Sequence, residues 1–171
     1  IDPSDPANVA GVRQPPANGN VVNPNATSPW PDGTKVSSEY GPRELFGRKF
    51  HGGIDGQVPQ GTPIKATVDD ATVLRAADTR GYGGLIVLQT RESDGSYTNH
   101  FFGHMSQLNV LEGSSVSTND TIIGLSGGAK GTRGAGDSTG AHLHYEIRRN
   151  ATPGNWNSGT AINPRLYNGR I

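Results

Sequence analysis

The 171-residue sequence contains no cysteine, and aromatic residues make up only 6% of it. Without cysteine the chain has no disulfide framework and none of the thiolates that most often complete a structural zinc site with four protein ligands. No apolar run approaches the roughly 20 residues that span a bilayer as a helix. The sequence therefore excludes a thiolate metal site and predicts no membrane span.

Neither sign of charge is in excess. Fifteen Lys and Arg residues balance fifteen Asp and Glu residues. No stretch gathers basic side chains into the stripe that a nucleic-acid backbone requires, so we expect no nucleic-acid partner. The length is that of one ordinary domain with an additional tail.

Residues 1–33 are this tail. They contain clusters of Pro, Asn and Gly without a periodic apolar pattern, which is typical of a linker that is dispensable for folding. The alternative is an extended N-terminal strap that packs on the domain through apolar residues such as Val21, Val22 and Trp30. The sequence starts with neither Met nor a signal-peptide pattern, so we expect a processed or excised fragment, tethered through this segment to a larger protein.

Residues 34–171 have the pattern of an all-β domain. Short runs of β-type residues alternate with turn residues, and no helical stripe is present. Hairpin turns are expected at 69–70 and 94–95. The apolar run Leu85–Leu88 is typical of a central strand covered on both faces. The predicted strands are 36–40, 63–68, 71–77, 85–90, 97–104, 114–116, 121–126 and 142–148.

Two histidine motifs carry the chemistry. His51 and Asp55 belong to the motif His-Gly-Gly-Ile-Asp, and His142 and His144 alternate along a predicted strand. Alternate residues share one face of a strand, so the two imidazoles of the second motif point the same way. Taken alone, the first motif would equally suit a turn-stabilising pair. Imidazoles with one carboxylate and an open position are typical of catalytic zinc, so together the motifs predict a metallohydrolase.

Further motifs extend this pattern over about residues 35–168. With them the sequence resembles the LytM/lysostaphin-type zinc endopeptidases, which cut the peptide part of bacterial peptidoglycan. The specificity lies in the order and spacing of many motifs. In the family's order they are 36–43, His51–Asp55, Gly61–Ala66, Tyr82-Gly83, Phe102–His104, Glu112-Gly113 with Val116, Ile123-Gly124, Ser138–Gly140, His142–His144 and Asn163-Pro164.

The resemblance implies an antiparallel β-sheet domain, a sandwich or half-barrel, with long loops that wall an active-site groove. It implies one Zn²⁺ held by His51, Asp55 and His144, with a water or hydroxide in the fourth position. His104 and His142 fall in the family's second pair of functional histidines. His142 is the better candidate for the general base because it shares a strand face with His144, and His104 would hydrogen-bond the tetrahedral intermediate, although the two roles are exchangeable.

Other residues have weaker assignments. Arg43 is a candidate for substrate binding, but an arginine in a loop usually forms a surface ion pair. Glu146 could orient a ligand histidine or face solvent. His100 is expected at the surface. Tyr82 is expected in the core or in the groove wall.

The sequence departs from the family pattern at two places. Gly56 stands where the family has a larger apolar residue, which affects local packing. The segment Ala129–Asp137 lengthens the loop before the second histidine motif, and we expect a mobile loop there that reshapes the groove.

The resemblance implies a zinc-dependent endopeptidase that hydrolyses cross-links or stem peptides of peptidoglycan through a metal-activated water. Its partner is the peptidoglycan peptide, and its location is extracytoplasmic (periplasm, cell wall or secreted) or virion-associated. The alternative is a non-catalytic peptidoglycan-binding or hydrolase-activating module, within a phage tail or secretion machine. That class predicts a replaced ligand, whereas His51, Asp55 and His144 are all present.

Overall fold

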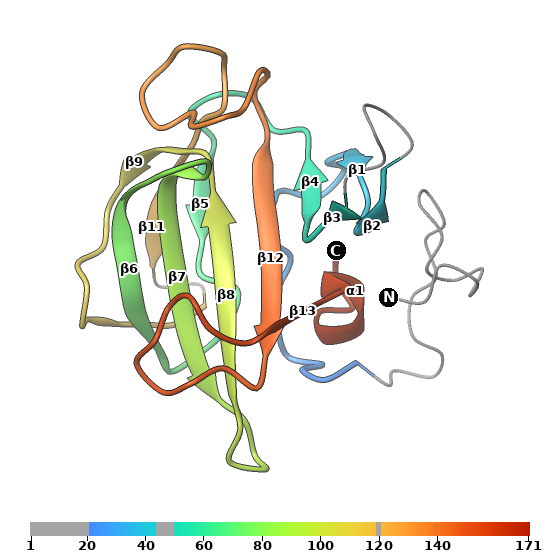
Figure 1. Cartoon of the computed structure of the whole chain (residues 1–171), viewed down its shortest axis with the longest axis vertical. Coiled ribbons are helices and arrows are strands. Elements are labelled where there is room, and N and C mark those ends of the chain that lie inside the picture. Colours follow the sequence, from blue (N-terminus) through green and yellow to red (C-terminus); the bar gives the residue numbers. More distant parts are fainter. Residues whose placement is uncertain (1–20, 44–49, 119–120) are drawn as a thin grey trace.

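The computed structural model describes residues 21–43, 50–118 and 121–171 (Figure 1). Almost all regular structure in this part of the chain is β-strand, which confirms the all-β prediction. The described residues contain no helix with the length and hydropathy of a membrane span. The elements are β1 (Val36–Ser38), β2 (Gly41–Pro42), β3 (Phe50–His51), β4 (Ile54–Gly56), β5 (Pro63–Lys65), β6 (Ala71–Thr79), β7 (Gly83–Arg91), β8 (Tyr97–Gly103), β9 (Met105–Leu108), β10 (Ser115–Val116), β11 (Ile122–Ser126), β12 (Leu143–Arg149), β13 (Thr160–Ile162) and α1 (Pro164–Tyr167).

The strands form one large antiparallel sheet and two small ones. The large sheet has the order β1-β4-β12-β8-β7-β6-β10, with β13 paired to β12, and the small sheets are β5-β11-β9 and β2-β3. The long strands β6, β7, β8 and β12 lie side by side in Figure 1. Side chains of β5, β9 and β11 join those of the large sheet in one apolar core. The architecture is therefore a two-layer sandwich. The open face is the face of the large sheet that points away from β5, β9 and β11, and a second apolar cluster covers part of it.

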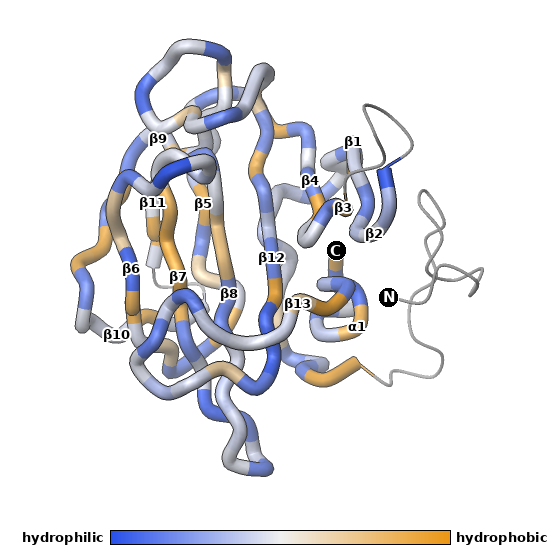
Figure 2. The backbone as a smooth tube through the Cα atoms, viewed as in Figure 1, coloured by the Kyte–Doolittle hydropathy of each residue, from blue (hydrophilic) through white to orange (hydrophobic). Residues whose placement is uncertain are grey.

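Strand β7 anchors both faces of the large sheet. Ile86 and Leu88 lie in the main core, while Leu85 and Val87 join a second cluster with Phe101 on the opposite face. All five side chains are fully buried. Figure 2 shows the resulting apolar stretch of β7. The prediction of a central strand covered on both faces is confirmed.

Strand β12 separates the core from the site. Leu143, Tyr145 and Ile147 lie in the main core, so the alternating residues His144 and Glu146 point to the other face. That second face is the open face, which also carries the small apolar cluster around Phe101. One face of β12 therefore stabilises the core through its apolar residues, and the other face carries polar side chains.

Several sequence predictions differ from the structure. The short strands β2, β3, β4, β9 and β13 were not predicted, because two to four residues are too few to show a period. The turn at 94–95 does join the paired strands β7 and β8. The turn at 69–70 joins β5 and β6, which belong to different sheets, so the hairpin predicted there is wrong.

His100 is fully buried, and its predicted surface position is wrong. Its Nε2 lies 2.8 Å from the hydroxyl oxygen of Thr90, and its ring meets the ring of Tyr167 edge-on at 5.1 Å. Tyr167 belongs to α1, which comes from the far end of the sequence and covers this part of β8. Burial, with a smaller contribution from the charge of Arg149, lowers the pKa of His100 to about 3.

Residues 21–33 lie against the domain. The backbone N–H of Val22 donates to the carbonyl of Leu166 in α1, and that of Thr27 donates to the carbonyl of Thr67. These are the contacts expected of the strap alternative. The prediction of a separate unit over residues 1–33 extends outside the described residues at 1–20, and its boundary stays a prediction.

Trp30 explains the unusual glycine at position 56. A Cβ on Gly56 would overlap the indole ring of Trp30. The indole is only 6% exposed and packs edge-on to Tyr145 at 6.4 Å. The N-terminal segment thus supplies the apolar group that Gly56 lacks.

Replacing Trp30 with Ala should lower the free energy of unfolding by about 3–5 kcal/mol, because truncating a buried Trp leaves a cavity. Urea denaturation measures this quantity. Val22→Ala is the matched control: Val22 lies in the same segment but is 40% exposed, so its substitution should change stability by no more than about 0.5 kcal/mol. Equal stability of Trp30→Ala and the parent would show that the segment contributes nothing to the fold.

The buried His100 should make the fold sensitive to acid. Its ordinary pKa is near 6.5 when unfolded and about 3 when folded, so below pH 6.5 only the unfolded chain gains its proton. The contribution of His100 to the free energy of unfolding is fully present above pH 6.5 and decreases as the pH is lowered toward 3. At pH 5 the loss relative to pH 7 is about 2 kcal/mol.

The measurement is urea denaturation of the parent and of His100→Gln at pH 7 and pH 5. The variant cannot take up this proton, so its loss of stability between the two pH values should be smaller by about 2 kcal/mol. All other titrating groups are the same in both proteins, so their contributions to the pH dependence cancel in the comparison. An identical pH dependence in the two proteins would refute the assignment.

Candidate metal centre

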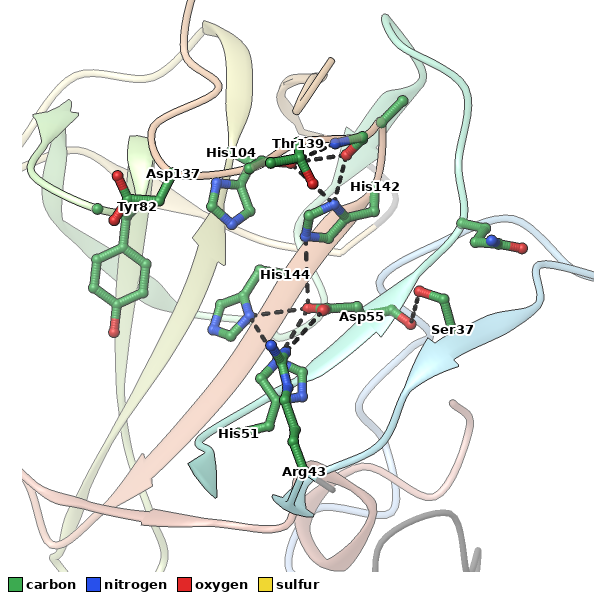
Figure 3. A pocket seen from close by; sticks show the side chains of 15 residues that line it. Ser37, Arg43, His51, Asp55, Tyr82, His104, Asp137, Thr139, His142 and His144 are labelled. Carbon is green, nitrogen blue, oxygen red and sulfur yellow. Dashed lines mark hydrogen bonds and ion pairs between the residues drawn. The ribbon is translucent and has the colours of Figure 1, made fainter. Parts of the chain in front are cut away.

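Three ligand-type side chains meet at one end of the open face. They are His51 on β3, Asp55 on β4 and His144 on β12, all buried. Asp55 Oδ1 lies 3.2 Å from His51 Nε2 and 3.0 Å from His144 Nδ1. The two histidine nitrogens are 3.3 Å apart. These are the three residues that the sequence predicts as metal ligands (Figure 3).

The triangle of donor atoms fits a zinc ion. Bonds of about 2.0–2.1 Å in tetrahedral geometry place two ligand atoms roughly 3.3 Å apart. The observed separations of 3.0, 3.2 and 3.3 Å agree with that spacing. Two imidazoles and one carboxylate are also a donor set that zinc accepts, with a fourth position left over.

Strand pairing and a glycine create the triangle. In the register of β12 with β4, His144 stands directly opposite Asp55. A Cβ on Gly53 would lie 2.6 Å from the carbonyl oxygen of Tyr145 and 2.7 Å from His144 Cε1. Only glycine leaves room for the histidine ring at this place, which gives a physical reason for the second glycine of the His-Gly-Gly-Ile-Asp motif.

The orientation of His51 is fixed by the backbone of a neighbouring strand end. Its Nδ1 lies 3.0 Å from the carbonyl oxygen of Glu39. A carbonyl only accepts, so Nδ1 carries the proton and Nε2 keeps its lone pair for the metal. The carboxylate of Glu39 is held in turn by Arg165, at 3.0 and 3.1 Å. A residue of the C-terminal helix thus supports a ligand near the start of the domain.

The ring of His144 lies between two carboxylates. Nδ1 faces Asp55, and Nε2 lies 2.9 Å from Glu146 Oε1. Burial on its own lowers the pKa of His144, but the hydrogen bonds to Asp55 and Glu146 raise it to about 9. Burial raises the pKa of Asp55, but the hydrogen bonds from His144 and His51 bring it far below its usual range. A metal ion that binds Nδ1 must displace a proton from it.

His142 and His104 lie beside the triangle, with their rings 4.8 Å apart. Nδ1 of His142 is 2.8 Å from the carbonyl oxygen of Gly140, and Nδ1 of His104 is 2.8 Å from that of Ala135. Both carbonyls accept, so in each neutral ring Nε2 is the free acceptor. Burial, followed by the charges of His142 and His144, lowers the pKa of His104 to about 4, so this ring is neutral at pH 7.

All five predicted site residues line one cavity of about 550 Å³, and Arg43 lines it too. Arg43 Nη2 lies 3.4 Å from Asp55 Oδ2, and the side chain is 44% exposed. The arginine therefore forms an ion pair at the border of the groove, and its role in substrate binding stays a prediction. Asp137 borders the cavity opposite Arg43, next to Tyr82 (Figure 3).

The loop before His142 is tied to the domain by backbone hydrogen bonds. The carbonyl of Gly134 accepts from the N–H of Gly84, and the N–H of Asp137 donates to the carbonyl of Gly81. The glycines of this loop permit close contact with the turn before β7, and the mobility expected from its composition stays a prediction. This attachment gives the histidines of the groove a defined wall.

The sequence points to Glu146 as a group that could orient a ligand histidine, but it gives no sign that Glu39, Arg165 and Tyr82 take part. Glu39 and Arg165 are 126 positions apart, and Tyr82 meets Glu146 across 64 positions. Residues this far apart in the sequence form no local motif that would predict their contact. The only available signal was the polar residue at position 146, two residues beyond a ligand in a strand.

Comparison with known proteins gives consistent matches. The family model for Peptidase family M23 matches residues 49–164. The DD-carboxypeptidase/endopeptidase Mpg of Neisseria meningitidis is 34% identical over 136 residues, which are 78% of this chain and 29% of Mpg. The peptidoglycan DD-endopeptidase ShyA of Vibrio cholerae is 32% identical over 120 residues, 66% of this chain and 24% of ShyA. The chain therefore spans only a minor part of these longer relatives.

A solved structure shows the same similarity. The catalytic domain of the antimicrobial peptidase lysostaphin from Staphylococcus simulans superimposes with a TM-score of 0.60 at 32% sequence identity. The alignment covers 77% of this chain and 89% of that domain. The chain thus shares the fold of a complete catalytic domain.

Proposed function

Because the chain belongs to peptidase family M23, we propose that it is a zinc-dependent endopeptidase that hydrolyses peptide bonds of bacterial peptidoglycan. The family membership confirms the predicted resemblance to the LytM/lysostaphin-type peptidases. One observation carries the proposal: the donor atoms of His51, Asp55 and His144 form a triangle of zinc-ligand size in a cavity that two further histidines line.

The three ligands would hold one zinc ion and leave a position open to the cavity. When bound there, zinc supplies a Lewis acid that polarises a carbonyl and lowers the pKa of a water. The chain's own contribution is to keep His51 Nε2 and His144 Nδ1 facing Asp55. The hydrogen bonds of His51 to Glu39 and of His144 to Glu146 do this before any ligand arrives.

His142 and His104 would handle protons. His142 Nε2 lies 3.8 Å from Asp55 Oδ1, so it is the better placed acceptor for a proton from an attacking water. His104 also presents an unprotonated Nε2 to the cavity. In the neutral ring the one proton is on Nδ1 and is donated to the carbonyl of Ala135. Nε2 would therefore donate a hydrogen bond to the developing charge on a carbonyl oxygen only after receiving a proton released by the attacking water.

The substrate class is inferred from what the similar proteins are named to act on. Mpg and ShyA are named as a DD-carboxypeptidase/endopeptidase and a peptidoglycan DD-endopeptidase, and lysostaphin as an antimicrobial peptidase. An open groove with Arg43 on one wall suits an extended peptide that carries a carboxylate. Peptidoglycan lies outside the cytoplasm, so we place the activity there, within a larger protein as the length of the relatives suggests. A non-catalytic module is less well supported, since no ligand is replaced.

The first prediction of this function is that the protein binds one zinc ion. Asp55→Ala and His144→Ala should lose it, because each removes a ligand, whereas His104→Ala and His142→Ala should keep it. Elemental analysis after gel filtration measures the stoichiometry. Retention of a full equivalent by Asp55→Ala would contradict the ligand set, and loss of zinc from His142→Ala would make His142 a ligand.

The second prediction concerns turnover. His104→Ala and His142→Ala should each reduce peptidoglycan cleavage by about 10²-fold or more, since an acid–base group contributes about 10²–10⁴ and an oxyanion donor about 10²–10³. The assay is the digestion of purified muropeptides with defined cross-links, with products identified by mass spectrometry. Zinc content and near-UV circular dichroism serve as controls for an intact site.

Two results would overturn this function. Absence of cleavage by the zinc-loaded parent on all cross-link types would reject the endopeptidase. An undiminished rate in His104→Ala would transfer its role to another group, with Arg43 the first of the other cavity-lining side chains to examine.

A further inference from the structure

Glu146 is a buried carboxylate with every oxygen engaged. The residue is only 4% exposed. Its Oε1 accepts from His144 Nε2 at 2.9 Å and from the Tyr82 hydroxyl at 3.0 Å, and its Oε2 accepts from Arg148 Nε at 2.7 Å. A buried charge is tolerated only when it is paired in this way.

Tyr82 and Arg148 are also bonded to each other. Arg148 Nη2 donates to the Tyr82 hydroxyl at 3.0 Å, so Tyr82, Glu146 and Arg148 form a closed ring of hydrogen bonds. The guanidinium group lies over the ring of Phe101 at 4.3 Å, and its Nη1 donates to Asn157 at 3.1 Å. The arginine is therefore fixed on several sides and cannot easily release the carboxylate.

The ring of hydrogen bonds connects two parts of the site. His144, Glu146 and Arg148 follow one another on the same face of β12. Tyr82 belongs to the turn before β7, and its carbonyl accepts from the backbone N–H of His104 at 2.7 Å. Through Tyr82, the group that supports the ligand His144 is linked to the backbone that carries His104.

We infer that Tyr82, Glu146 and Arg148 are positioning residues that select the metal-binding nitrogen of His144. Arg148 turns one carboxylate oxygen of Glu146 toward itself and thereby presents the other to His144 Nε2. An acceptor at Nε2 keeps a proton on that nitrogen and leaves Nδ1 as the ligand atom. The inference rests on the proposed metal site, but the orientation of His144 is a property that can be tested without metal.

The decisive variant is Glu146→Gln. It keeps the shape of the side chain but replaces one carboxylate oxygen, an acceptor, by an amide NH₂ group, a donor. Arg148 can only donate, so it should draw the amide oxygen to itself and turn the amide NH₂ toward His144 Nε2. His144 then needs its proton on Nδ1, where the metal should bind. We expect zinc affinity to fall by about 10–100-fold.

The double variant Glu146→Gln with Arg148→Met separates positioning from a structural role. Without the arginine, the amide is free to turn its oxygen back to His144, so the double variant should recover most of the lost zinc affinity. If the network had only a structural role, the double variant should bind zinc more weakly than Glu146→Gln alone. Arg149→Met is the matched control, because Arg149 is the next residue of β12, faces the other side and contacts Tyr167.

Zinc affinity is measured by competition with a chelator on the full chain. The state of His144 is read separately from ¹⁵N chemical shifts of the imidazole in zinc-free protein. The parent should have a protonated Nε2, and Glu146→Gln an unprotonated one. Tyr82→Phe, which removes only a hydroxyl, should lose zinc affinity several-fold and provides the test if Glu146→Gln fails to fold.

Failure of the positioning role and failure of the proposed function give different results in these experiments. Full zinc affinity in Glu146→Gln, or further loss in the double variant, overturns the positioning role while leaving the proposed function intact. Failure of the parent to bind zinc overturns the proposed function, and the ¹⁵N shifts of His144 still decide whether Glu146 and Arg148 set its protonated nitrogen. A drop in zinc affinity for Arg149→Met equal to that of Glu146→Gln would also reject the inference.

Discussion

The backbone hydrogen bonding of β12 between β4 and β8 is the constraint on which the site depends. It sets His144 opposite Asp55 on one side and opposite Gly103 on the other. A shift of the pairing by one residue would turn His144 into the core and bring Leu143 to the open face. The apolar residues of β12 oppose such a shift, because they are packed in the main core. Hydrophobic burial on one face of the strand therefore fixes His144, a proposed metal ligand, on the other.

Burying the ligands creates a second requirement, which the chain meets with ion pairs behind each histidine. Arg165 pairs with the carboxylate of Glu39, whose backbone carbonyl accepts from His51. Arg148 pairs with Glu146, whose carboxylate accepts from His144. Removing one partner of a buried pair typically costs about 3–5 kcal/mol, whereas the complete pair adds little net stability. These pairs are thus better understood as devices for orientation than as sources of stability.

The fold uses segments from both ends of the described chain to close the sandwich. Trp30 fills the space beside Gly56, and Tyr167 covers the part of β8 that carries His100. The sequence offers the packing of Trp30 only as the alternative to a linker, since a segment rich in Pro and Asn resembles a linker even when one tryptophan anchors it. It gives no sign of the contact of Tyr167. A single buried indole outweighs the polar residues around it, because apolar burial contributes in proportion to area.

The sequence by itself determined the all-β class, the covered central strand and the types of donor that meet in the site, because period-two alternation and short motifs are local properties. It placed His51, Asp55 and His144 in one ligand set through the resemblance. Only the tertiary structure decided which nitrogen of each histidine faces the others and which groups hold it there. The physical reason is that these partners are far apart in sequence and come together only through strand register and packing, which no local pattern encodes.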